Sequence, residues 1–152
     1  MAYTTAESRQ ELLDELAAAA DELGLALACV GEAHAQMDDV SADKIEVELF
    51  KPVQSAYGRA KRTHSEFAGR HGMPGRTFVS PTAGLPSKGA AGFLQEAVSA
   101  VGRADIGLGE LQDSMLPVEA GDAELRAGLT AIRDGIAGLA ERSRDFLRGF
   151  GR

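Results

Sequence analysis

The strongest limit on how this chain can fold is set by a Gly- and Pro-rich stretch at its middle, HGMPGRTFVSPTAGLPSKG. The stretch spans residues 71–89. On either side of it the sequence is rich in Ala and Leu with Glu and Arg between them, which is helix-forming material. Because Gly and Pro at this density do not continue a helix, we expect a loop over residues 72–86. The chain is therefore expected to divide into two helical halves.

Apolar residues recur at steps of three and four along both halves, which is the pattern of helices with one buried face. We expect helices over residues 5–38 and 42–71 in the first half, and over residues 87–116 and 122–149 in the second. Apart from residues 77–79, no segment alternates between apolar and polar residues in the manner of a strand. The expected fold class is therefore all-α.

Side chains that can accept hydrogen bonds from free backbone amides indicate where three of these helices begin. Thr4 and Glu7 fit a capping box at the start of the first helix. Ser41 or Asp43 is expected to cap the second helix, and Asp122 is expected to cap the fourth.

Pro52 lies inside the second predicted helix. A proline there has no amide hydrogen to donate, and its ring clashes with the carbonyl of the residue four positions earlier. We therefore expect a kink near Pro52, or a short helix followed by a longer one.

Four helices of similar length, paired by short turns, predict a four-helix bundle that forms a single domain over residues 1–152. We expect two helical hairpins in up-down-up-down antiparallel order, because most bundles connect neighbouring helices. The alternative is a central loop that crosses the bundle. About 15 extended residues at roughly 3.3 Å each reach about 50 Å, whereas a helix of about 28 residues spans about 42 Å. A crossing loop would make the third helix parallel to the second.

Charged residues concentrate at the turns and around the central loop, and the net charge is −7. Asp39, Asp43 and Glu46 belong to an acidic cluster at the first turn, and residues 110–124 contain a second. In the antiparallel order both clusters would share one end of the bundle. That acidic pole would dock a partner of opposite charge, or another copy of the chain. Helix capping and solubility account for the same charges without any partner.

Composition argues against several classes of protein. A net charge of −7 disfavours a nucleic-acid partner. One cysteine, Cys29, excludes an internal disulfide. The N-terminus lacks the pattern of a signal peptide, and the longest uncharged apolar stretch, residues 23–31, is far shorter than the roughly 20 residues that cross a membrane. We therefore expect a cytoplasmic protein without a membrane partner, and the preference for Arg over Lys is typical of a high-GC bacterium.

No combination of side chains predicts catalysis. The histidines His34, His64 and His71 lack the Glu-x-x-His spacing of a di-iron bundle, so we interpret them as core-edge residues hydrogen-bonded to neighbours. His34 and Asp38 stand one helical turn apart and, with Asp39 or Asp113, come nearest to a cation site. We expect no metal and no cofactor.

The expected function is that of a non-enzymatic interaction or adaptor module, with a protein partner or a second copy of the chain. The candidate interaction residues are Arg76, Phe78 and Lys88 in and beside the central loop, and Asp39, Asp43 and Glu46 at the first acidic turn. The alternative function is binding of a small ligand or metal ion in a bundle cavity lined by Tyr57, His64 and Phe67.

Overall fold

The structure is a computed structural model that describes residues 4–150. Within these residues helices are the dominant structure and there is no strand, which confirms the predicted all-α class. The elements are α1 (Thr5–Ala35), α2 (Asp39–Ile45), the π-helical turn η1 (Glu46–Phe50), α3 (Lys51–Arg70), the 3₁₀ turn η2 (Pro86–Lys88), α4 (Gly89–Asp113), α5 (Leu116–Glu119), α6 (Ala123–Ile136) and α7 (Leu139–Phe150). No described helix is both long enough and apolar enough to span a membrane.

Two of the predicted helix starts are confirmed. The amide of Glu7 donates to Thr4 Oγ1 at 3.1 Å, and the amide of Thr4 donates to Glu7 Oε2 at 3.1 Å, which completes the capping box of α1. At the start of α6, the amide of Leu125 donates to Asp122 Oδ1 at 2.8 Å.

The predicted cap of the second helix is wrong. α1 ends at Ala35 rather than at residue 38, and α2 begins at Asp39 rather than at residue 42. The cap is Asp38, whose Oδ1 accepts a hydrogen bond from the amide of Ser41 at 2.8 Å. A carboxylate in this position satisfies an otherwise free amide, so the second helix begins three residues earlier than predicted and the turn has the predicted length.

A π-helical turn takes the place of the expected kink near Pro52. In η1 the amide of Lys51 donates to the carbonyl of Glu46, five residues earlier. The widened turn lies directly before Pro52, which cannot donate the usual backbone hydrogen bond. The helix therefore continues from α2 through η1 into α3 instead of breaking.

The last predicted helix, residues 122–149, is divided in two. α6 ends at Ile136 and α7 begins at Leu139, which is fully buried. Between them Gly138 adopts a left-handed conformation with φ of 78°. Only glycine populates this conformation readily, so Gly138 fixes the break.

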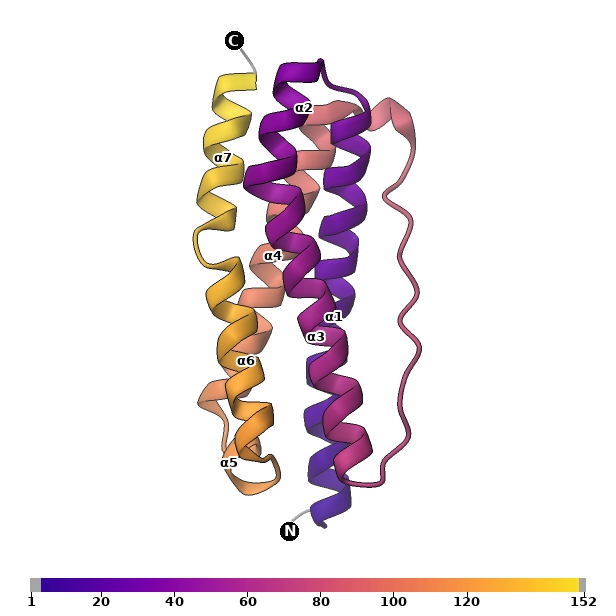
Figure 1. The fold of residues 1–152 in the computed structure, drawn as a ribbon, viewed down its shortest axis with the longest axis vertical. Coiled ribbons are helices and arrows are strands. Elements are labelled where there is room, and N and C mark those ends of the chain that lie inside the picture. The colour runs from indigo at the N-terminus through magenta and orange to yellow at the C-terminus, as the bar shows by residue number, and fades with distance from the viewer. Residues whose placement is uncertain (1–3, 151–152) are drawn as a thin grey trace.

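The predicted up-down-up-down order is wrong, and the crossing-loop alternative describes the chain. Residues 72–85, called the strap below, run without helix along the length of α3 (Figure 1). At one end of the molecule Gln36 Nε2, just after α1, donates to the carbonyl of Pro86 at 3.3 Å. At the other end Arg9 Nε donates to the carbonyl of Ala120 at 3.3 Å. α4 is therefore antiparallel to α1 and parallel to α3, because the extended strap returns the chain to the end where α3 began.

The core is mainly aliphatic and is built mainly on α1, which packs most extensively against α4 and also against α3. α6 packs on α3, and α7 packs on α4 and η1. The contact between α3 and α6 is close at Gly128, where a Cβ atom would lie 2.7 Å from Thr63 Cγ2. This glycine permits the approach of the two helices, whereas a Cβ at Gly102 of α4 would meet no atom within 4 Å.

Candidate functional site

The structure divides the residues of the predicted interaction surface into three groups. These are the acidic residues Asp39, Asp43 and Glu46 on α2 and η1, the strap pair Arg76 and Phe78, and Lys88, which ends η2 directly before α4. Arg76 and Phe78 contact each other, with the guanidinium carbon 4.9 Å from the centroid of the Phe78 ring. Lys88 lies instead over the ring of Phe93, with Nζ 5.6 Å from the centroid.

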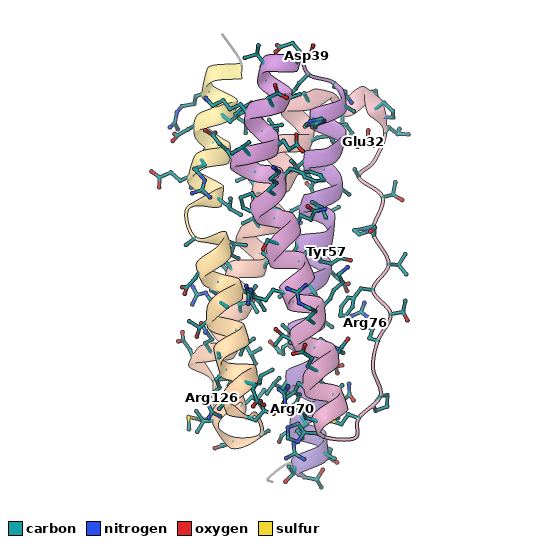
Figure 2. The ribbon with its side chains drawn as sticks, in the orientation of Figure 1. Glu32, Asp39, Tyr57, Arg70, Arg76 and Arg126 are labelled. Carbon is teal, nitrogen blue, oxygen red and sulfur yellow. The ribbon has the colours of Figure 1, made fainter. Side chains whose placement is uncertain are left out.

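The predicted acidic pole does not form, because the two acidic turns lie at opposite ends of the molecule. Figure 2 shows Asp39 at one end and Arg70, the last residue of α3, at the other. At that second end Arg70 Nε donates to Asp122 Oδ2 at 2.8 Å and lies 3.0 Å from Glu124 Oε2. The parallel course of α3 and α4 thus separates the acidic clusters and brings the end of α3 against the second one.

The strap lies over the face that α1 and α3 form together. Arg76 Nη2 donates to Asp21 Oδ2 of α1 at 2.7 Å, and Figure 2 shows the Arg76 side chain turned from the strap toward the helices. The ring of Phe78 meets the imidazole of His64 of α3 edge to face, with the centroids 5.3 Å apart and the planes at 89°. Two neighbouring strap residues therefore reach both helices of the first hairpin.

A groove of about 440 Å³ separates the strap from α3. It is lined by Lys61, Arg62, Ser65 and Glu66 from α3 and by Arg76 and Phe78 from the strap. Among these lining residues three are cationic and Glu66 alone is acidic. A chain with a net charge of −7 thus has a locally cationic groove with an aromatic ring beside it; we call it the cationic groove.

Two of the three cations have no carboxylate partner in the described part of the chain. Neither Lys61 nor Arg62 lies within 4.0 Å of an acidic oxygen there. Lys61 instead lies over the ring of Tyr57, with Nζ 4.2 Å from the centroid. Arg76 is paired with Asp21, but both side chains are nearly half exposed, so the pair contributes only about 0–1 kcal/mol. All three cations are therefore accessible to an anion that enters the groove.

His64 is buried directly beneath the strap. The residue is 4% exposed, and the Nδ1 atom of its imidazole has no hydrogen-bond partner among the described residues. The expected hydrogen bond to a neighbour is thus not made at this atom, whereas His71 Nε2 does lie 2.8 Å from Asp122 Oδ2. Burial, followed by the positive charge of Arg76, lowers the pKa of His64, against a smaller opposing effect of Asp14. The buried imidazole is therefore neutral at neutral pH.

The side chains expected to line a ligand cavity, those of Tyr57, His64 and Phe67, are all buried in the core. The exposed fraction of the most exposed of them, Tyr57, is 5%. These residues therefore fill the space between α3 and its neighbours instead of lining an open cavity.

The side chains considered for a cation site do not come together. Asp38 caps α2 at one end of the molecule, whereas Asp113 ends α4 near the other. His34 instead lines a recess of about 310 Å³ with Gly31, Glu46 and Phe50. Among residues 4–150 no group of three or more His, Cys, Asp or Glu side chains is arranged to hold a metal ion.

The α3 side of the cationic groove was missed from the sequence. Lys61 and Arg62 belong to the basic residues around the loop, but in the antiparallel order the loop would leave α3 at its end, away from both side chains. The sequence feature that indicates their position beside the loop is the length of the loop. A loop that returns along the preceding helix places Arg76 and Phe78 beside the side chains of that helix.

No protein-family model, curated protein or solved structure matches this chain at a significant level.

Proposed function

We propose that this chain is a non-enzymatic interaction module that binds an acidic segment of a partner protein in the cationic groove. The observation that carries this proposal is the convergence of Lys61, Arg62 and Arg76 around the half-buried ring of Phe78. Two of these cations have no carboxylate partner among the described residues, and they come from a different element than the third.

The chemistry of the groove suits carboxylates. Hydrogen bonds between Arg or Lys and a carboxylate are charge-assisted and are stronger than neutral ones. An Arg guanidinium also accepts a carboxylate in a two-pronged geometry that a lysine cannot offer. The Phe78 ring adds an apolar surface for a neighbouring side chain of the bound segment. Because the groove is open, its affinity should depend on salt.

The charge of the whole chain favours a short acidic segment over a long polyanion. A nucleic acid would extend beyond the groove onto a surface with an excess of negative charge, since the net charge is −7. A segment of a few acidic residues touches only the local cations. The absence of a nucleic-acid partner and the cytoplasmic location stay predictions from charge and composition.

We also propose that the scaffold is a four-helix bundle. Its four rods would be α1, the continuous helix α2–η1–α3, α4, and the broken helix α6–α7. The packing of α1 on α3 and α4, of α6 on α3, and of α7 on α4 supports this grouping. In such a scaffold the strap and the groove occupy the outer face of the first hairpin, where a partner can reach them.

The test is binding of a fluorescein-labelled hexa-aspartate peptide, followed by fluorescence anisotropy at low salt. The variant Lys61→Glu/Arg62→Glu reverses the two unpartnered cations of the groove. The control Arg142→Glu/Arg144→Glu changes the net charge by the same amount on α7, where both side chains are exposed. We expect about a tenfold or larger loss of affinity in the groove variant, equivalent to about 1.4 kcal/mol or more.

The control variant should bind the peptide nearly as well as the unaltered chain. Equal losses in the two variants would mean that only the overall charge matters, and this would remove the groove from the argument. Absence of any binding by the unaltered chain at low salt would contradict the proposed function itself.

A further inference from the structure

The middle of the strap is attached through a titratable side chain. Phe78 covers His64, and the same strap supplies Arg76 and Phe78 to the cationic groove. Whatever changes the contact between Phe78 and His64 therefore also changes the groove.

Few other contacts fix this part of the strap. Arg76 is joined to Asp21 by a pair in which both side chains are 44–45% exposed. A pair so exposed to solvent stabilises little. The next fixed points are near the strap ends, where the amide of Met73 donates to the carbonyl of Ala68 at 2.8 Å and Gln36 donates to Pro86. Between those ends Phe78 and Ala83 pack against the hydrophobic core, so Phe78 supplies the apolar attachment at the middle of the strap.

His64 is in an environment that suits only its neutral form. Its Nδ1 is buried and has no hydrogen-bond partner among residues 4–150, so a proton added there would have no acceptor. The charged groups that act on the imidazole are Arg76 of the strap and Asp14 of α1. Toward α6, Thr63, the residue before His64, lies against Gly128, which carries no charge. Burial and Arg76 together outweigh Asp14.

We propose that His64 and Phe78 form a latch: protonation of the buried imidazole releases the strap and so takes apart the cationic groove. An open strap gives the imidazolium access to water and removes the guanidinium of Arg76 from its vicinity. The last step of this inference rests on the proposed function, because only then does release of the strap also release a partner.

The direction of the pH effect follows from linkage. In the closed state the pKa of His64 lies below its ordinary value of 6.5, and in the open state it returns toward that value. As the pH falls between these two values, the open state takes up a proton that the closed state does not. The population of the open state then rises by up to about tenfold per pH unit, and above the ordinary pKa the strap stays closed.

The latch and simple electrostatics predict opposite results for an acidic ligand. Protonation of His64 adds a positive charge near the groove, which alone would strengthen binding of an anion. Release of Arg76 and Phe78 removes half of the cationic and aromatic lining and weakens it. Aspartate side chains have an ordinary pKa of about 3.9, so a hexa-aspartate probe stays charged over the window that matters.

The latch itself is tested by NMR without any ligand. The imidazole signals of His64 and the backbone amides of residues 76–80 are followed from about pH 8 to about pH 5, a range that includes the ordinary histidine pKa. We expect the strap amides to shift with the same midpoint as His64. Strap amides that do not follow the His64 titration would overturn the latch.

Two variants separate the latch from a general acid effect. In Phe78→Ala the strap should be open at neutral pH, and the pKa of His64 should rise toward 6.5. In His64→Phe the buried ring remains without a proton site, so the strap amides should stay unchanged over the whole range. A His64 pKa that is the same in Phe78→Ala and the unaltered chain would contradict the proposal, even if His64→Phe does not fold. His34→Gln serves as the control, because His34 lies on α1 away from the strap contact.

Binding of the hexa-aspartate peptide then links the latch to function. We expect the unaltered chain to bind several-fold more weakly at about pH 5.5 than at about pH 7.5, and His64→Phe to lose this dependence. Tighter binding on acidification would overturn the latch. Failure of the peptide to bind at about pH 7.5 would instead contradict the proposed function, while the NMR titration would still decide the latch.

Discussion

The carboxylate of Asp122 accepts hydrogen bonds from both Arg70 Nε and Arg70 Nη2, at 2.8 and 2.9 Å. The residue that caps α6 is thereby tied to the last residue of α3. The amide of Leu125 and the imidazole of His71 reach the same carboxylate, each at 2.8 Å. Asp122 thus combines a helix cap with the junction between the two helical hairpins.

Replacement of Asp122 should be more costly than loss of an ordinary cap. Asp122→Ala removes the acceptor for the amide of Leu125 and both hydrogen bonds from Arg70, which keeps only Glu124 as a partner, so we expect a loss of about 1–2 kcal/mol in the free energy of unfolding. Asp122→Ser keeps a capping oxygen and should lose less. Urea denaturation measures both. Equal losses in the two variants would show that the cap contributes nothing.

The same carboxylate should make stability depend on acidic pH. Arg70, the amide of Leu125 and His71 hold the pKa of Asp122 well below its ordinary value of 3.8. The unfolded carboxyl therefore takes up a proton near pH 3.8 while the folded one stays charged. This contribution to stability is complete above the ordinary pKa and is lost as the pH falls below it. Urea denaturation at about pH 5 and about pH 2.5 should show a smaller loss in Asp122→Asn than in the unaltered chain.

Gly128 and Gly102 should respond to alanine in opposite ways. A Cβ at Gly128 would lie 2.7 Å from Thr63 Oγ1 and Cγ2, on a short, β-branched and buried side chain. Gly128→Ala should therefore destabilise the protein by about 1–3 kcal/mol, as overpacking of a core does. Gly102→Ala meets no atom and should stabilise it by about 0.5–1 kcal/mol through helix propensity. Thermal unfolding of the two variants in parallel checks the pair, and a stabilised Gly128→Ala would contradict the close approach of α3 and α6.

Cys29 should be unreactive in the folded protein. The residue is fully buried, and burial is the main reason that the pKa of its thiol is raised. We expect slow labelling by a thiol reagent at neutral pH in buffer and rapid, complete labelling in concentrated urea. Rapid labelling under native conditions would mean that α1 opens readily near this residue.

The helices and their capping residues were largely predictable from sequence, because they depend on local chemistry. The three- and four-residue spacing of apolar residues and the caps at Thr4 and Asp122 required no knowledge of distant contacts. The break at Gly138 and the π-helical turn before Pro52 were not specified in advance. A glycine within a helical pattern either continues the helix or interrupts it, and the local sequence around Gly138 does not say which of the two occurs.

The order of the helices was not predictable from the same information. Both orders bury the same apolar stripes, and the reach of the loop permitted either one. The choice depends on contacts between residues far apart in sequence, such as that of Arg9 with Ala120. The candidate site shared this uncertainty. Arg76 and Phe78 stood out as basic and apolar residues in a Gly- and Pro-rich loop, but their partners Asp21 and His64 follow only from the course of the strap.

The extended strap is about as long as the helix along which it returns. Residues 72–85 reach about 46 Å when extended at roughly 3.3 Å each, and the helix from residue 39 to residue 70 measures about 48 Å at 1.5 Å per residue. Deletion of a few strap residues would prevent α4 from starting beside the end of α1. The second hairpin would then have to run in the opposite direction along the first. Insertions would carry no such penalty. The length of a loop often varies without changing a fold, but here it determines the direction in which the second half of the chain runs.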